Sequence, residues 1–134
     1  MSEKCEHNHG DFSWNELSVT DPQQAIHFYQ KVFGWTIEEM DMPNGKYYIL
    51  FNGAEKIGGI TAKDPKEANS PTAWMPYITV NDVDKAAAQI VKLGGSIILP
   101  PQDIPVENGP RLTILKDPMG ATLGAITYAN DTAS

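Results

Sequence analysis

The sequence contains a single cysteine, Cys5, among its 134 residues. One thiol cannot close an internal disulfide, so nothing in the cysteine content requires an oxidising compartment. No run of apolar residues approaches the roughly 20 that cross a bilayer, and the first ten residues are polar where a secretory signal needs an apolar segment. These absences predict a cytoplasmic protein with no membrane partner.

Basic residues are also scarce. Ten Lys and Arg stand against 17 Asp and Glu, which gives a formal net charge of −7, and Arg111 is the single arginine. A polyanionic partner needs clustered Lys and Arg side chains that displace its counterions, and the sequence has no such stripe. The composition therefore excludes nucleic acid as the expected partner.

The chain is long enough for one hydrophobic core and too short for two independent ones. We therefore expect one domain over residues 11–129. The apolar pattern divides it into a first module over about 11–61, a linker over 62–71 and a second module over about 72–129. Around it lie a flexible leader over 1–10 and a tail over 130–134.

The first module has the alternation, helix caps and turn residues of a strand, a helix and a three-stranded meander. FSWNELSV alternates as a strand does, Asp21 followed by Pro22 is a helix start, and Gly34 is a helix stop. Turn pairs that tolerate positive φ then separate three β-rich segments, at Asn44-Gly45 and Asn52-Gly53. The order is β, α, β, β, β.

The same order restarts after the linker. At an offset of 61 the capping residue Asp21 meets Asp82 and the helix stop Gly34 meets Gly95, while at an offset of 66 residues 57–61 meet residues 123–127. The matches fall on a helix cap, a helix stop and a last strand, which a duplicated unit must keep. The sequence predicts an α+β fold made of two tandem βαβββ modules.

The FY…FGW segment of the first helix and the closing DPMGATLG turn and strand resemble the glyoxalase, bleomycin-resistance and extradiol dioxygenase superfamily, also called the vicinal oxygen chelate family. The resemblance covers about residues 11–129. WNELSVTD and AWMPYITVNDVDKAAA look more narrowly like its glyoxalase-like hydroxylase subgroup. The family's fold implies two modules whose sheets face a shared cavity, and homodimers are common in it.

Metal-dependent members of that family place one ligand on the first and one on the last strand of each module. The matching positions here hold Trp14, Met75, Gly58 and Gly124. None of these side chains can coordinate Zn²⁺, Mg²⁺ or Fe²⁺. We therefore expect no metal and no other cofactor, with a divalent metal on displaced ligands as the alternative.

Strand alternation predicts which side chains line the cavity. Leu17, Val19, Ile78 and Val80 take the helix-covered face, so Trp14, Glu16 and Ser18 of the first strand point the other way, as do Met75, Tyr77 and Thr79 of its repeat. One of the neighbours Tyr47 and Tyr48 also points there. This lining suits a small organic ligand, aromatic or anionic, although the same side chains can also simply fill the interior.

Two charged residues and a terminal cluster are further candidates. Glu16 is a catalytic general base or an ion-pair partner of Arg111, and Arg111 alternatively binds an anionic ligand group. Cys5, His7 and His9 in the leader favour incidental metal affinity over a functional site. His27 is interpreted as a helix-surface residue.

Two classes of function stay open at this point. The first is a metal-free binding protein that holds a small molecule between its modules. The second is an enzyme with displaced metal ligands, either a glyoxalase-like lyase or isomerase, or a dioxygenase- or hydroxylase-type oxidoreductase. Because the family's metal-ligand positions hold no coordinating side chain here, the sequence favours the binding protein.

Overall fold

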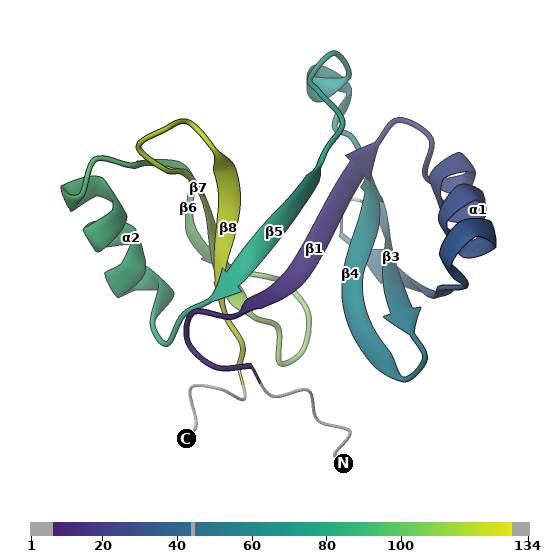
Figure 1. The fold of residues 1–134 in the computed structure, drawn as a ribbon, viewed down its shortest axis with the longest axis horizontal. Helices are drawn as coiled ribbons and strands as arrows, with labels where there is room; N and C mark the ends of the chain where they lie inside the picture. The colour runs from purple at the N-terminus through teal and green to yellow at the C-terminus, as the bar shows by residue number, and fades with distance from the viewer. Residues whose placement is uncertain (1–6, 44, 130–134) are drawn as a thin grey trace. The chain divides into compact units, whose positions relative to one another are not determined.

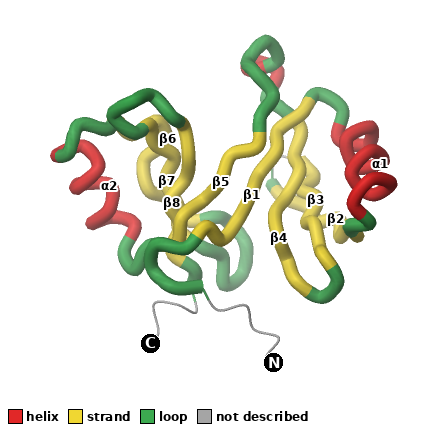
Figure 2. Tube along the Cα trace, in the orientation of Figure 1, coloured by secondary structure: helices red, strands yellow, loops and turns green. Residues whose placement is uncertain are grey.

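The computed structural model describes residues 7–43 and 45–129, which form two compact units. The first unit holds residues 14–74. The second holds residues 75–129 together with the preceding segment 7–13. Eight strands and two α-helices follow one another along the chain in the predicted order. This confirms the α+β class and the repeated βαβββ plan (Figures 1 and 2).

The first unit is a four-stranded sheet with one helix on it. Its elements are β1 (Phe12–Val19), α1 (Pro22–Phe33), β2 (Thr36–Met42), β3 (Gly45–Asn52) and β4 (Glu55–Ala62). The strand order is β2-β3-β4-β1, in which β1 runs parallel to β4 and the other pairs are antiparallel. Leu17, Leu50 and Ile60 of the sheet pack with Ile26 of α1 to form its core.

The second unit repeats this arrangement. A short 3-10 turn, η1 (Pro65–Glu67), precedes β5 (Trp74–Thr79), α2 (Val83–Lys92), β6 (Ser96–Asp103), β7 (Arg111–Lys116) and β8 (Thr122–Thr127). The order is β6-β7-β8-β5, with β5 parallel to β8. Val83 of α2 packs against Leu115 and Ala125 of the sheet.

Three helix caps are those that the sequence predicts, whereas the C-cap of α2 is Leu93, two residues before Gly95. The Asp21 carboxylate accepts a hydrogen bond from Gln24 N, and Gly34 ends α1 in the left-handed conformation at φ 76°. Asp82 accepts from the amides of Asp84 and Lys85 at the start of α2. Each bond satisfies an amide that the helix itself leaves without a partner. Neither helix in the described part of the chain is both long and apolar enough to cross a bilayer.

Strand β6 contains two prolines. It continues through Pro100 and Pro101 to Asp103. Proline lacks the amide that a ladder needs, so a strand tolerates it at an edge or a bulge. β6 is at the outer end of its sheet's order, and its register with β7 shifts twice, on either side of Leu99.

The leader is more ordered than expected where the structure describes it. The Gly10 amide donates to Thr79 O and the Thr79 amide donates to Asp11 O, at 2.7 and 2.8 Å. The Asn81 amide donates to His9 Nδ1 at 3.0 Å. Hydrogen bonding to the end of β5 needs no apolar periodicity, so the sequence pattern could not signal it. Cys5 of the predicted metal-affine cluster lies outside the described residues.

Candidate functional site

The candidate site of the first unit is the sheet face opposite α1, which we call the helix-free face. Leu17 and Val19 pack in the α1 core, so their neighbours Trp14, Glu16 and Ser18 project to the helix-free face. Tyr48 packs against the same core and its hydroxyl accepts from Gln23 of α1 at 3.3 Å. Tyr47 therefore lies on the helix-free face, which decides between the two tyrosines.

Trp14 and Tyr47 are joined on this face. The Trp14 indole Nε1–H donates to the Tyr47 hydroxyl at 3.0 Å. The hydroxyl end of Tyr47 also covers Gly59, because a Cβ built on Gly59 would collide with its Oη, Cζ and Cε2 atoms. The tyrosine therefore occupies the space into which any side chain at position 59 would extend.

The second unit has a counterpart built from another tyrosine. In the parallel pair of β5 and β8, Tyr77 lies beside Gly124. A Cβ on Gly124 would collide with the Cγ, Cδ2 and Cε2 atoms of the Tyr77 ring, which is only 3% exposed. Met75 and Thr79 alternate with Ile78 and so share the face of Tyr77. The Thr79 hydroxyl is buried, and the described residues offer it no hydrogen-bond partner.

Strand register corrects one step of the repeat alignment. Gly59 stands beside Glu16 and Gly124 beside Tyr77, and Glu16 and Tyr77 are equivalent at the offset of 61. Gly59, not Gly58, is thus the partner of Gly124. The pairing of β3 with β4 passes from Lys56 to Gly58 and skips Ile57, so a bulge adds one residue to this strand. Two adjacent glycines made the shift invisible in the sequence.

The side chains at the family's metal positions do not fit a metal. Trp14 offers an N–H donor that is already bonded to Tyr47, and Gly59 and Gly124 are covered by aromatic rings. Met75 offers a thioether, which suits soft ions only. Within residues 7–43 and 45–129, no group of three or more His, Cys, Asp or Glu is placed to hold an ion.

Arg111 pairs with two carboxylates of its own unit. Its guanidinium donates to both oxygens of Asp84, from Nε at 2.9 Å and Nη2 at 3.0 Å, and from Nη1 to Asp103 at 3.2 Å. Asp84 lies in the first turn of α2 and Asp103 ends β6, so the arginine links the helix to the outer strand of the sheet. The prediction of an ion pair with Glu16 is replaced by this one, and an anionic ligand would have to compete with two carboxylates.

The ion pair makes a testable pH prediction. The Arg111 guanidinium holds the pKa of Asp84 below its ordinary 3.8. Native Asp84 thus stays ionised to lower pH than unfolded Asp84, and the stability it adds is complete above the unfolded pKa and lost as pH falls through the native one. We expect the melting-temperature gap between the wild type and Asp84→Asn to be constant from pH 7 to about 5 and to close below the unfolded pKa. Thermal melts across pH measure it, and Arg111→Met should abolish the same pH dependence.

A second prediction concerns Gly59. Gly59→Ala forces the Tyr47 ring to swing away from Trp14, at a cost of about 2 kcal/mol of unfolding free energy. In a Tyr47→Ala chain the same change should be neutral or slightly stabilising, because alanine is better than glycine in a strand. Gly58→Ala is the matched control: its Cβ would meet the Asn15 backbone oxygen, so Tyr47→Ala should not rescue it. Urea unfolding of the five variants tests the pairing, and an equal cost of Gly59→Ala in both backgrounds would contradict it.

The chain is similar in sequence to a described protein family and to several named proteins. A family model described as "Glyoxalase/Bleomycin resistance protein/Dioxygenase superfamily" matches residues 12–124. A Mycobacterium tuberculosis protein named "Putative glyoxylase CFP32" is 35% identical over 121 residues, which are 90% of this chain and 45% of that protein. The "Anthracycline biosynthesis protein DauV" of a Streptomyces species is 25% identical over 122 residues, 81% of this chain and 44% of that protein. The chain thus spans a little under half the length of these relatives.

Solved structures show the same fold. A Streptomyces coelicolor methylmalonyl-CoA epimerase variant in complex with 2-nitronate-propionyl-CoA superposes with a TM-score of 0.68 at 16% identity, and the match covers 91% of this chain and 99% of that one. A superfamily member from Vibrio splendidus superposes with a TM-score of 0.60 at 14% identity over 84% and 95% of the two chains.

Proposed function

The chain belongs to the glyoxalase/bleomycin resistance protein/dioxygenase superfamily, and on that premise we propose that it binds a small, partly aromatic organic molecule on its helix-free faces without a metal ion. One observation carries the proposal: Tyr47 covers Gly59 and Tyr77 covers Gly124, at the last-strand positions where metal-dependent members carry a ligand. An aromatic ring and a hydroxyl replace a carboxylate there. That change favours stacking and hydrogen bonding over ion coordination.

The lining of the first unit supports an aromatic ligand. Trp14 and Tyr47 present large ring surfaces, and their mutual hydrogen bond fixes both rings before any ligand arrives, which lowers the entropic cost of binding. Glu16 and Ser18 add polar groups on the same face. Two Streptomyces relatives carry names from anthracycline biosynthesis, whose compounds are planar and aromatic. A planar polycyclic ligand is therefore our first choice.

Tryptophan fluorescence tests the proposal, with the soluble planar probe anthraquinone-2-sulfonate. We expect saturable quenching with a micromolar to millimolar Kd, at least a tenfold loss in Tyr47→Ala, and loss of the quenching in Trp14→Phe. Trp35→Phe is the matched control, because Trp35 packs in the α1 core and should leave the Kd unchanged. The proposal fails if quenching is unsaturable or survives unchanged in both Trp14→Phe and Tyr47→Ala.

A glyoxalase-type reaction is the second candidate, since a relative at 35% identity carries that name. In it Glu16 would act as the general base, because it is the acid that strand alternation places beside Trp14 on the helix-free face. The assay is turnover of the methylglyoxal–glutathione hemithioacetal by protein whose metal content has been measured. Turnover that requires a stoichiometric metal and is lost in Glu16→Gln would replace the binding role. Retention of a metal without turnover would still refute metal independence.

Homodimerisation belongs to the same proposal, since the family resemblance implies it. Light scattering during gel filtration should give about twice the 14.7 kDa mass of the chain.

A further inference from the structure

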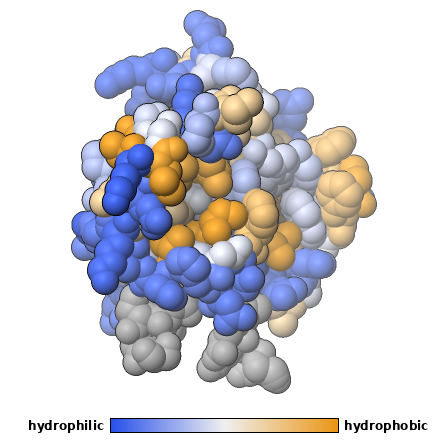
Figure 3. All heavy atoms as spheres, turned by 60° about the vertical axis from the view of Figure 1, so that its left-hand side comes forward, coloured by the Kyte–Doolittle hydropathy of each residue, from blue (hydrophilic) through white to orange (hydrophobic). Residues whose placement is uncertain are grey.

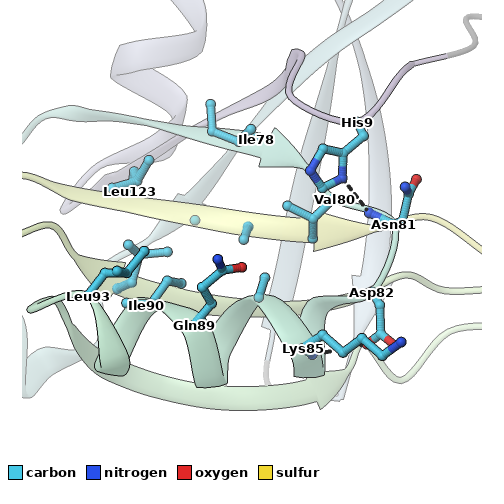
Figure 4. A pocket seen from close by; sticks show the side chains of 14 residues that line it. His9, Ile78, Val80, Asn81, Asp82, Lys85, Gln89, Ile90, Leu93 and Leu123 are labelled. Carbon is cyan, nitrogen blue, oxygen red and sulfur yellow. Dashed lines mark hydrogen bonds between the residues drawn. The ribbon is translucent and has the colours of Figure 1, made fainter.

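A hollow of about 450 Å³ lies between α2 and the sheet of the second unit. Its walls are apolar side chains from both sides, and Figure 3 shows apolar atoms gathered on the face of the molecule that carries α2. Ile78 of β5 and Val80, just beyond the end of that strand, lie on one side, and Ile90 and Leu93 at the far end of the helix lie on the other (Figure 4). The hollow opens on the opposite face of the sheet from Tyr77, so it is separate from the proposed helix-free site.

The two copies of the module show why the hollow exists. In the first unit, Tyr29 of α1 stacks on Phe33 and Trp35 at 6.1 and 5.6 Å between ring centroids, and Trp74 packs edge-on at 5.4 Å. The hollow beside Trp35 and Trp74 measures about 140 Å³. At the offset of 61 the large side chains are replaced by smaller ones: Ile26 by Ala87, Tyr29 by Ile90, Phe33 by Gly94 and Trp35 by Ser96. The second unit thus keeps the helix and sheet but lacks the rings that fill the space between them.

Most polar side chains of the hollow lie at one end, and Gln89 adds an amide part-way along α2. His9, Asn81 and Lys85 lie near the start of α2, and the other end is lined by Leu93, Ile90 and Leu123 (Figure 4). His9 accepts the Asn81 amide through Nδ1, so the neutral ring carries its proton on Nε2 as a donor. The Asp82 carboxylate also lies here, but it is bonded to the amides of Asp84 and Lys85 at 3.0 and 3.2 Å. Lys85 therefore supplies a positive charge at this end of the hollow.

We propose that this hollow binds an aliphatic carboxylate of medium chain length, with its hydrocarbon along α2 and its carboxylate at Lys85 and His9. The volume lies within the 300–1,000 Å³ typical of ligand sites, and a site for a small molecule combines apolar walls with a few convergent polar groups. An ammonium and a ring N–H at one end complement a carboxylate and disfavour a cationic head group. The inference goes beyond the proposed function and does not depend on it.

Calorimetric titration with hexanoate, octanoate and decanoate below their micellar concentrations tests the inference. Each buried methylene contributes about a fourfold gain in affinity, so we expect roughly a fifteenfold gain for each two carbons added. Decylamine should bind at least tenfold more weakly than decanoate. Equal affinities for the three acids, or for the acid and the amine, would overturn the proposal.

Matched variants locate the ligand. Ala86 lines the hollow and Ala88 is exposed on the same helix. Ala86→Leu should fill part of the space, weaken decanoate binding at least tenfold and raise the melting temperature of the free protein, whereas Ala88→Leu should leave binding unchanged. Lys85→Gln should weaken decanoate binding about fivefold without affecting decanol, and Lys92→Gln, exposed and outside the lining, should do neither.

The outcomes separate this inference from the helix-free site. Decanoate binding should persist in Trp14→Phe, which loses the anthraquinone response. If Ala86→Leu and Ala88→Leu bind decanoate equally well, or if decanoate fails to bind the wild type at millimolar concentration, the hollow is not a carboxylate site. The melting temperature of free Ala86→Leu reports whether that variant has folded.

Discussion

Gly124→Ala is expected to lower the free energy of unfolding by about 3 kcal/mol, although it adds only one methyl group. The new Cβ would collide with the Tyr77 ring, including its Cγ next to the backbone, and Tyr77 is 3% exposed. A buried ring held near its own backbone has little room to swing aside. Removal of the ring should therefore cancel the cost, so that Gly124→Ala in a Tyr77→Ala chain changes stability by less than about 1 kcal/mol.

Tyr77→Phe is the control for that cycle. It keeps the ring atoms that the new Cβ would meet, so the cost of Gly124→Ala should persist there. Chemical unfolding of the single and double variants gives the coupling energy. If Tyr77→Ala leaves the cost of Gly124→Ala unchanged, the ring does not cover the glycine.

Trp74→Ala should cost about 3 kcal/mol in the first unit. The Trp74 indole donates to the Tyr29 hydroxyl at 3.1 Å and meets the Tyr29 and Trp35 rings edge-on at 5.4 and 6.1 Å. Tyr29→Phe removes only the hydrogen bond and should cost about 1 kcal/mol.

The exposed ring of Phe28 provides the comparison. Phe28 is 56% exposed and contacts Tyr29 from the outside of the cluster, so Phe28→Ala should cost less than about 1 kcal/mol. Urea unfolding followed by far-ultraviolet circular dichroism avoids reliance on the altered tryptophan. Equal losses for Trp74→Ala and Phe28→Ala would mean that the cluster is not anchored by Trp74.

The order of elements was predictable because it depends on local signals. Asp21 and Asp82 accept hydrogen bonds from amides at the start of a helix, and Gly34 ends a helix through its left-handed conformation. The structure confirms all three. The alternation in β1 likewise placed Leu17 in the core of the first unit. Such signals act over a few residues, so a single sequence carries them.

The errors arose where a contact spans distant segments. Two such contacts leave no local pattern in the sequence. Residues 10 and 11 bond to the end of β5, and Arg111 pairs with Asp84, which is 27 residues away. The prolines of β6 are compatible with a strand only because of its place in the sheet and its irregular register. The site was therefore predicted by strand face alone, while the Trp14–Tyr47 bond and the hollow beneath α2 required coordinates.

The glycine–tyrosine pairs also constrain how this protein can change over evolutionary time. A carboxylate at position 59 would meet the Tyr47 ring, and one at position 124 would meet the Tyr77 ring. The first substitution alone would lower stability before any coordination was gained, so a smaller residue must replace each tyrosine beforehand. A carboxylate ligand at either position could therefore be gained only through a step that selection for folding opposes.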